Sequence, residues 1–300
     1  EVERLEAQWL SRDAFRARFQ AGAGRPVILR GLPVPRCGFR ELQKRLAREM
    51  VPLKRKAKEE ASESWAWMAD AGRCPLGELV GGLLEGEASE TRRQFVCRYG
   101  PDAQLFHWHA WNVCPKEWMA TPSLFRSALT ELCERELQDD VASRPTLFVA
   151  PAATGSGLHV DDDETHFWMT LVEGRKRWRL VHPDAMANLK PRCLAELNPV
   201  FLRGLDEICP PPDVLEAELQ AGESIFVPAG WAHQVDNLEP SVALSANFID
   251  GSNLERARQF MELTALVSSD ALPLARVLGS PDAAELAASE AAAGTAQAAK

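Results

Sequence analysis

A run of short strand patterns between Thr146 and Ile249 constrains the fold of this chain more than any other feature. The patterns are rich in Val, Leu, Phe and Trp, and Gly, Pro or Asp residues that favour turns separate them. Many short strands joined in this way are typical of a β-sandwich or a jelly-roll barrel. The predicted strands cover residues 146–150, 158–161, 167–172, 176–181, 224–227, 233–237 and 242–248.

Helical patterns flank this run on both sides, so we expect a mainly β fold with flanking helices. The division predicted is an N-terminal α/β region over 1–120, a jelly-roll core over 121–250, and a C-terminal helix with an Ala-rich tail over 251–300. The predicted helices cover residues 13–20 after a Ser11 cap, 39–50, 121–137, and a segment that begins with a capping box from Ser252 to Glu255. Further predictions are strands at 25–31 and 93–99, an irregular charged segment at 52–92, and a weak helix or frayed tail at 283–300.

Two segments within the strand run carry side chains that bind metals. His159 and Asp161 stand in the sequence LHVD, and His233 follows a Pro-Ala-Gly-Trp turn. Residues i and i+2 of a strand face the same side, so His159 and Asp161 can hold one ion together. Two imidazoles and one carboxylate that leave open coordination positions are the ligand set of non-haem Fe(II) sites. An H-x-D triplet alone is common by chance, but both segments together predict a metal site.

Lys176 is the second chemical feature of the run. Residues 167–181, with Glu173-Gly174 at their centre, predict a hairpin whose second strand places Lys176 and Trp178 on one face and three arginines on the other. The arginine face is the natural solvent face, so Lys176 points inward. A buried ammonium needs an anion, such as the distal carboxylate of a dicarboxylate that chelates the metal. The alternative is that Lys176 extends to the rim and reaches water.

At the level of whole motifs the chain resembles the JmjC-domain Fe(II)/2-oxoglutarate oxygenases, and most of all their small stand-alone hydroxylases. The matching segments occur in the family's order. They are RPVILRGL at 25–32, GSGLHVD at 155–161, LVEGRKRWRLVHP at 171–183 and AGESIFVPAGWAHQVDNLEPSVALSANF at 221–248. The resemblance implies a cupin-like, double-stranded β-helix barrel with iron bound by His159, Asp161 and His233.

The resemblance also assigns a cosubstrate pocket. It implies that Lys176 pairs with the C5 carboxylate of 2-oxoglutarate and that Ser156, Ser245 and Asn247 line the pocket around it. One position departs from the family, because Met169 stands where close relatives carry an Asn. This difference removes one hydrogen bond to the cosubstrate and leaves the metal ligands intact.

The activity implied is that of an Fe(II)- and 2-oxoglutarate-dependent dioxygenase that uses O₂ and releases succinate and CO₂. Hydroxylation of a protein side chain is favoured over N-demethylation, since the chain carries no recognisable reader domain or zinc cluster. Two other classes stay open at this point. One is a catalytically inactive cupin-like module that binds a protein, and the other is a metal cupin that does not use 2-oxoglutarate, such as an isomerase. The intact ligands argue against the first and Lys176 against the second.

Other candidate residues carry weaker signals. His107 and His109 share a face if extended and could form a second metal site, although an aromatic lid is the preferred interpretation. Tyr99 is either a pocket residue or a packing residue, and His166 and His182 are predicted at the surface or at strand ends. The acidic run that follows Asp161 lacks the spacing of a calcium loop and is interpreted as solvated. An apolar shell around the metal is expected from residues such as Trp168, Trp178, Phe226 and Trp231.

Composition restricts the partners. The formal charge of −9 argues against nucleic acid as the main partner and leaves a protein or peptide substrate as the first expectation. No apolar run approaches 18 residues, so no membrane span is expected. The seven cysteines are scattered and include no C-x-x-C pair, which favours reduced thiols and a cytoplasmic or nuclear location. A homodimer through the C-terminal helices is a further expectation, drawn from the relatives.

Overall fold

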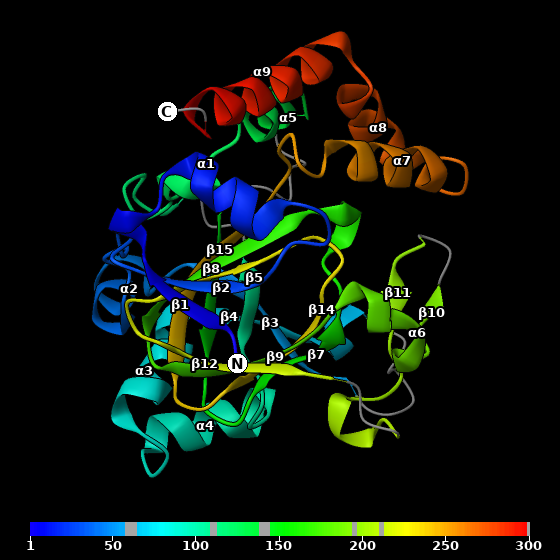
Figure 1. Ribbon diagram of the computed structural model, residues 1–300. Coiled ribbons are helices and arrows are strands. Elements are labelled where there is room, and N and C mark those ends of the chain that lie inside the picture. The colour runs from blue at the N-terminus through cyan, green and yellow to red at the C-terminus, as the bar shows by residue number, and fades with distance from the viewer. Residues whose placement is uncertain (58–64, 109–112, 138–144, 194–196, 210–212, 299–300) are drawn as a thin grey trace.

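Two β-sheets face each other across an apolar core in the computed structural model, which describes residues 1–57, 65–108, 113–137, 145–193, 197–209 and 213–298 (Figure 1). The larger sheet has seven strands in the order β1-β2-β13-β8-β15-β6-β5, antiparallel except for the pair β1 and β2. Its strands are β1 (Glu3–Glu6), β2 (Val27–Arg30), β5 (Leu105–Trp108), β6 (Thr146–Ala150), β8 (His166–Glu173), β13 (Ser224–Val227) and β15 (Ser241–Phe248).

The smaller sheet has four antiparallel strands in the order β12-β9-β14-β7. They are β7 (Gly155–His159), β9 (Arg175–Val181), β12 (Leu215–Gln220) and β14 (Ala232–Asn237). Two further strand pairs lie outside these sheets, namely β3 (Met50–Lys56) with β4 (Met68–Pro75) and β10 (Arg192–Cys193) with β11 (Pro199–Val200).

Side chains that point alternately to the two faces of each strand form the core between the sheets. On β8, Phe167, Met169 and Leu171 face the smaller sheet and pack with Trp178 and Leu180 of β9. Trp168, between the first two, faces the opposite side. The strand is therefore buried on both faces, which explains why its sequence is an apolar run rather than a simple alternation.

The outer face of the larger sheet is covered by the N-terminal helical segment and by a short turn near Phe125. Phe15 and Phe19 pack there with Phe125, Trp168 and Phe226. The segments involved are α1 (Arg12–Phe15), the π-helical η2 (Arg16–Gln20) and the 3-10 turn η5 (Ser123–Phe125). The same layer excludes water from the back of the larger sheet.

The remaining helices form two groups. One packs beside β3 and β4 and the other lies at the end of the molecule that contains the C-terminal helices (Figure 1). The first group is α2 (Phe39–Leu46), α3 (Leu76–Glu85) and α4 (Glu90–Tyr99). The second is α5 (Ala128–Leu137), α7 (Leu254–Thr264), α8 (Leu272–Leu278) and α9 (Pro281–Ala298). Two further short helices are η6 (Asp162–Glu164) and α6 (Met186–Leu189).

The predicted jelly-roll is confirmed as far as two facing antiparallel sheets within a mixed α/β molecule. No pairing of described strands closes these sheets into a barrel. Every predicted strand of the run from 146 to 248 is present within one to three residues. The sequence prediction missed β12, although its LEAELQ pattern alternates.

Two N-terminal predictions are wrong. Residues 93–99 belong to helix α4 rather than to a strand, because Ser89 caps that helix by accepting a hydrogen bond from the Arg92 N–H at 2.9 Å. Residues 52–92 contain β3, β4 and α3 in their described part and are not irregular throughout. Pairing between β3 and β4 stabilises these charged strands, and a single-strand pattern does not reveal such pairing.

Helix boundaries differ where tertiary contacts intervene. The helix predicted at 121–137 is divided between η5 and α5, and Glu290 of α9 accepts the Ala128 N–H at 3.1 Å at the new helix start. The Ser11 cap is confirmed, but the Ser252 capping box is wrong, because the Ser252 hydroxyl donates to Asp250 and Asn253 is the N-cap. The Ala-rich tail, predicted to be either a weak helix or a frayed end, forms helix α9. The helix predicted at 39–50 ends at Leu46 and Met50 begins β3.

None of the described helices combines the length and the apolar character that a membrane crossing requires.

Replacing Phe226 by Ala tests the outer layer of the larger sheet. Phe226 is fully buried and contacts Phe15 and Phe125, so the variant leaves a cavity. We expect the free energy of unfolding to fall by about 3–5 kcal/mol in denaturant titrations. Trp9 is 80% exposed, and Trp9→Ala is the control that should leave stability unchanged. Equal stability of Phe226→Ala and the wild type would contradict this packing.

Candidate metal centre and cosubstrate cavity

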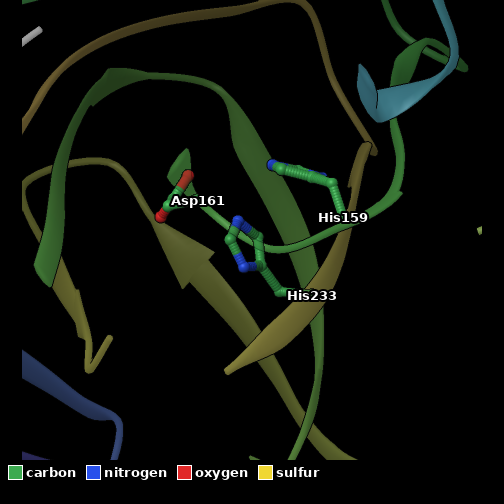
Figure 2. A group of neighbouring side chains, drawn as sticks. All are labelled: His159, Asp161 and His233. Carbon is green, nitrogen blue, oxygen red and sulfur yellow. The ribbon is translucent and has the colours of Figure 1, made fainter. Parts of the chain in front are cut away.

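Pairing between β7 and β14 brings the two candidate histidines together. His159 lies directly opposite His233 in the antiparallel register, so both side chains project from the same face of the sheet. Their ring centroids are 4.2 Å apart. Figure 2 shows both imidazoles and the Asp161 carboxylate directed toward a common point.

The hydrogen bonds of the two imidazoles decide which ring nitrogen faces that point. His159 Nδ1 lies 2.7 Å from the Gly157 carbonyl oxygen, and His233 Nδ1 lies 3.1 Å from that of Trp231. A carbonyl only accepts, so Nδ1 carries the proton in each ring and Nε2 carries the lone pair. This tautomer is the one that presents Nε2 to a metal, and it is held by the backbone two residues upstream.

Asp161 lies two residues beyond His159 in extended backbone, just after β7 ends. The i, i+2 argument therefore holds even though Asp161 is outside the strand. Burial raises the pKa of its carboxyl to about 7, and a hydrogen bond from Asn247 opposes that rise. Burial lowers the pKa of His233 to about 4 and that of His159 well below its usual value. Both rings are therefore neutral near pH 7, as metal ligands must be.

The three side chains fit a divalent metal. One potential ligand atom from each of His159, Asp161 and His233 lies within 4.8 Å of the others. A partly buried carboxylate with a raised pKa is stabilised in its charged form by a cation. Elsewhere in the described part of the chain no other group of three such residues comes this close.

The metal ligands open into a cavity of about 180 Å³ between the two sheets. Its walls combine aromatic and aliphatic side chains with a small number of polar groups, as is common for small-molecule sites. The lining residues besides the three ligands are Gln104, Phe106, His107, Phe148, Ala150, Gly155, Ser156, Asp162, Thr165, Phe167, Met169, Lys176, Trp178, Val235, Asn237 and Asn247.

Lys176 points into this cavity, as the hairpin alternation predicts. It is only 4% exposed, so it does not extend to the rim. Its Nζ donates a hydrogen bond of 2.5 Å to Asn237 Oδ1. Burial lowers the pKa of Lys176 to about 7, and no described carboxylate offsets that effect. The arginines of β9 lie on the opposite face, where Arg177 pairs with Asp236 and Arg179 with Asp206.

Asn237 and Gln104 were missed by sequence reasoning. Asn237 lies opposite Lys176 in the register of β14 and β9, and its amide donates to Thr154 Oγ1 at 2.8 Å. Alternation from His233 would have placed Asn237 on the inner face, so a signal existed. Gln104 donates to the Gly155 carbonyl at 2.9 Å, and nothing in its local sequence points to the cavity.

The remaining predicted pocket residues occupy different places. Ser156 and Asn247 line the cavity, and Asn247 donates to Thr165 Oγ1 at 2.9 Å. Ser245 lies on the same face of β15, but it is fully buried against Thr146 and is absent from the lining. Met169 lines the cavity with an apolar side chain.

The structure shows where the weaker candidate site residues lie relative to the cavity. Tyr99 packs against Phe95 in the N-terminal core and stands apart from the cavity lining. His107 lines the cavity, and its predicted partner His109 is outside the described residues. His182 is partly exposed at a strand end, as predicted. His166 is the first residue of β8, so the strand-end prediction holds for it, but it is buried and not at the surface.

The expected apolar shell is only partly right. Trp178 lines the cavity, whereas Trp168 and Phe226 face the outer side of the larger sheet. Trp231 packs in the core between the sheets without reaching the cavity. Trp168 on β8 and Phe226 on β13 face away from the cavity because successive side chains of a strand point to opposite faces of the sheet.

Comparison with known proteins finds one domain family whose model spans the metal-ligand segments and Lys176. The model of the Cupin-like domain family matches residues 13–253, which is most of the chain. The chain belongs to the cupin-like domain family. Within this cupin-like chain, the matched range includes all three candidate metal ligands and Lys176.

The cupin-like chain is also distantly homologous to named oxygenases. It is 30% identical over 168 residues to the 2-oxoglutarate and iron-dependent oxygenase JMJD4 of Homo sapiens, covering 53% of this chain and 39% of that protein. It is 30% identical over 125 residues to the arginine-specific demethylase JMJ22 of Arabidopsis thaliana, covering 39% and 25%. The bifunctional arginine demethylase and lysyl-hydroxylase psr-1 of Caenorhabditis elegans matches at 31% over 118 residues, covering 35% and 30%. Each match spans less than half of the relative's length.

Removing a metal ligand tests the centre. We expect the wild type to bind one Mn(II) or Co(II) ion, with a rise in melting temperature that EDTA reverses, because the ion binds the folded state only. His233→Ala and Asp161→Ala should each weaken binding at least 100-fold in titrations followed by electron paramagnetic resonance. His182→Ala, which changes a histidine outside the cavity lining, is the control. Unaltered affinity in both ligand variants would rule out this centre.

Proposed function

We propose that this protein is an Fe(II)- and 2-oxoglutarate-dependent dioxygenase that hydroxylates a side chain of a protein substrate. The observation that carries the proposal is the buried Lys176 in the same cavity as the triad of His159, Asp161 and His233. A metal site with a buried ammonium beyond it suits a ligand that chelates with one end and carries a carboxylate at the other. The relatives named as 2-oxoglutarate and iron-dependent oxygenases support the same assignment.

Iron would be held by His159 Nε2, His233 Nε2 and an Asp161 oxygen. When bound, it supplies the O₂-dependent oxidation that is coupled to decarboxylation of the keto acid. The chain's own residues hold the ligands in place. The Gly157 and Trp231 carbonyls fix the two imidazole tautomers, and Asn247 donates to the carboxylate of Asp161.

The distal part of the cavity would bind the cosubstrate. Lys176 pairs with the C5 carboxylate in this proposal, and Asn237 fixes the direction of its ammonium. Ser156 and Asn247 are the neighbouring hydrogen-bonding groups, whereas Ser245 bonds Thr146 behind the lining of the cavity. Met169 leaves one wall of the cavity apolar, at the position where close relatives in the JmjC-domain family carry an Asn.

The strand order supports a double-stranded β-helix. From β6 to β9, and again from β12 to β15, the chain divides its strands between the larger and the smaller sheet. Such winding places residues distant in sequence on facing strands, which suits a site assembled from three motifs. The predicted division of the chain into regions 1–120, 121–250 and 251–300 also stays a prediction.

A protein substrate is proposed because relatives are named as a lysyl-hydroxylase and as arginine demethylases. N-demethylation by the same chemistry is the alternative within the class. A catalytically inactive module is disfavoured, since an inactive binding domain has no need for three intact ligands and a buried, costly ammonium. A cytoplasmic or nuclear location and a homodimer through the C-terminal helices also stay predictions. Leu263 in the last turn of α7 and Leu266 and Val267 just after it are exposed, which is compatible with such a dimer.

Anaerobic titration with Fe(II) and 2-oxoglutarate tests the function. We expect a weak visible charge-transfer band that requires both components, together with succinate formation once O₂ is admitted. Asp161→Ala should lose both signals. A folded wild-type protein that gives neither the band nor succinate would overturn the oxygenase proposal.

Replacing Lys176 by Met separates cosubstrate binding from metal binding. We expect affinity for 2-oxoglutarate to fall at least 30-fold, while Mn(II) affinity stays at the wild-type level. Stability should stay constant or rise by on the order of 1 kcal/mol, because a buried charge is replaced by an apolar chain of similar length. Lys44→Met on the surface of α2 is the matched control. Wild-type cosubstrate affinity in Lys176→Met would refute the pocket assignment.

Proton uptake on cosubstrate binding gives a pH test. The pKa of Lys176 is about 7 without a partner, and a bound carboxylate raises it. Above pH 7 binding should therefore take up as much as about one proton, and affinity should fall as pH rises. Calorimetry of the Mn(II)-loaded protein at pH 8, in two buffers of different ionisation enthalpy, measures this uptake. Uptake that persists in Lys176→Met would show that another group is responsible.

A further inference from the structure

A buried imidazole behind the metal centre joins the two chain segments that carry the ligands. His166 opens β8, five residues after Asp161, and is 3% exposed. Its Nδ1 accepts the backbone N–H of Ala229 at 3.0 Å. Ala229 lies in the turn between β13 and β14, four residues before His233. The imidazole therefore bridges the Asp161 segment and the His233 segment.

The hydrogen bonds around His166 determine its tautomer. Because Nδ1 accepts from Ala229, the proton is on Nε2, which donates to Ser252 Oγ at 2.9 Å. The Ser252 hydroxyl in turn donates to Asp250 Oδ1 at 2.6 Å. Burial lowers the pKa of His166 to about 4, so the ring is neutral near pH 7. The ring thus has one accepting and one donating nitrogen, and both are used.

A side chain is needed at this point because the backbone ladder ends there. β13 pairs with β8 up to Val227 and Phe167, and the next residue, Pro228, has no N–H to continue the ladder. The His166 side chain takes the place of the missing rung by accepting the N–H one residue further on.

The far end of this chain of bonds is firmly anchored. Asp250 accepts a hydrogen bond from Gln20 at 2.9 Å and lies 3.6 Å from Arg16 Nε. Arg16 also pairs with Glu290 of α9 at 2.8 Å. Next to Asp250, the Asn253 amide donates to the Glu164 carbonyl in η6 at 2.8 Å. The C-terminal helices and the loop after Asp161 are therefore tied to the same cluster.

Ser252, His166 and Asp250 are also the residue types of a hydrolytic triad, but their hydrogen bonds exclude that role. A general base needs the lone pair of the imidazole toward the serine, whereas Nε2 presents its proton to Ser252 Oγ. The serine proton is directed at Asp250 instead.

We propose that His166 is a positioning residue for the metal centre, which holds the Asp161 segment and the His233 turn at the separation that metal binding requires. The inference rests on the proposed metal site and goes beyond it by assigning a role to a residue that contacts neither metal nor cosubstrate. Partners that orient metal ligands typically change affinity by about 10–100-fold when removed.

The test compares metal affinity with stability in the full-length chain. His166→Phe keeps an aromatic ring but leaves the Ala229 N–H without its acceptor. We expect Mn(II) affinity to fall at least 10-fold, with a changed visible spectrum of the Co(II) form. His166→Asn, whose Oδ1 can accept the same N–H, should recover a large part of the affinity. Met261→Ala is the control for stability, because it removes a buried side chain of α7 outside this network.

The outcomes separate the proposals. Wild-type Mn(II) affinity and Co(II) spectrum in His166→Phe would overturn the positioning role, as would an equal loss of affinity in Met261→Ala. If His166→Phe does not fold, Ser252→Ala cuts the network at its exposed middle link, between His166 and Asp250, and should weaken Mn(II) binding several-fold. Wild-type affinity in that variant would then count against the proposal. Failure of the wild type to bind Mn(II) at all would instead refute the metal centre itself.

Discussion

The antiparallel pairing of β7 with β14 is the interaction on which the site depends. It sets His159 opposite His233, so that two imidazoles from distant parts of the chain share one face with ring centroids 4.2 Å apart. Asp161 then needs only two residues of extended backbone to reach the same point. β9 lies on the other side of β14 and delivers Lys176 to the same cavity through its pairing with Asn237. A one-residue slip in either register would turn these side chains out of the cavity.

Two desolvated groups of opposite charge, Asp161 and Lys176, give the cavity its chemistry. Burial raises the pKa of Asp161 and lowers that of Lys176, each to about 7, so the protein bears the cost of desolvating both. A cation beside Asp161 and a carboxylate beside Lys176 would remove that cost. Asn237 holds Lys176 from the neighbouring strand β14, and Asn247 bonds Asp161 from β15 of the larger sheet.

Much of the central region could be predicted because its strands are short, apolar and clearly separated by turns. Alternation in one hairpin sufficed to place Lys176 inward and the β9 arginines outward. Prediction failed where a helix cap or a contact distant in sequence outweighs the composition of the segment itself. Residues 93–99 have a strand-like composition, yet the Ser89 cap and packing of Phe95 make them helical. The break before α5 coincides with a hydrogen bond that the Ala128 N–H donates to Glu290, which is far away in sequence.

The amino-acid sequence by itself determined the candidate ligands, the inward direction of Lys176 and the strands that carry them, because these follow from residue type and from the two-residue period of a strand. Only the tertiary structure decided which nitrogen of each imidazole faces the cavity, that Ser245 lies outside its lining, and that His166 is buried between the ligand segments. These properties depend on cross-strand register and on hydrogen-bond partners distant in sequence, which no local pattern contains.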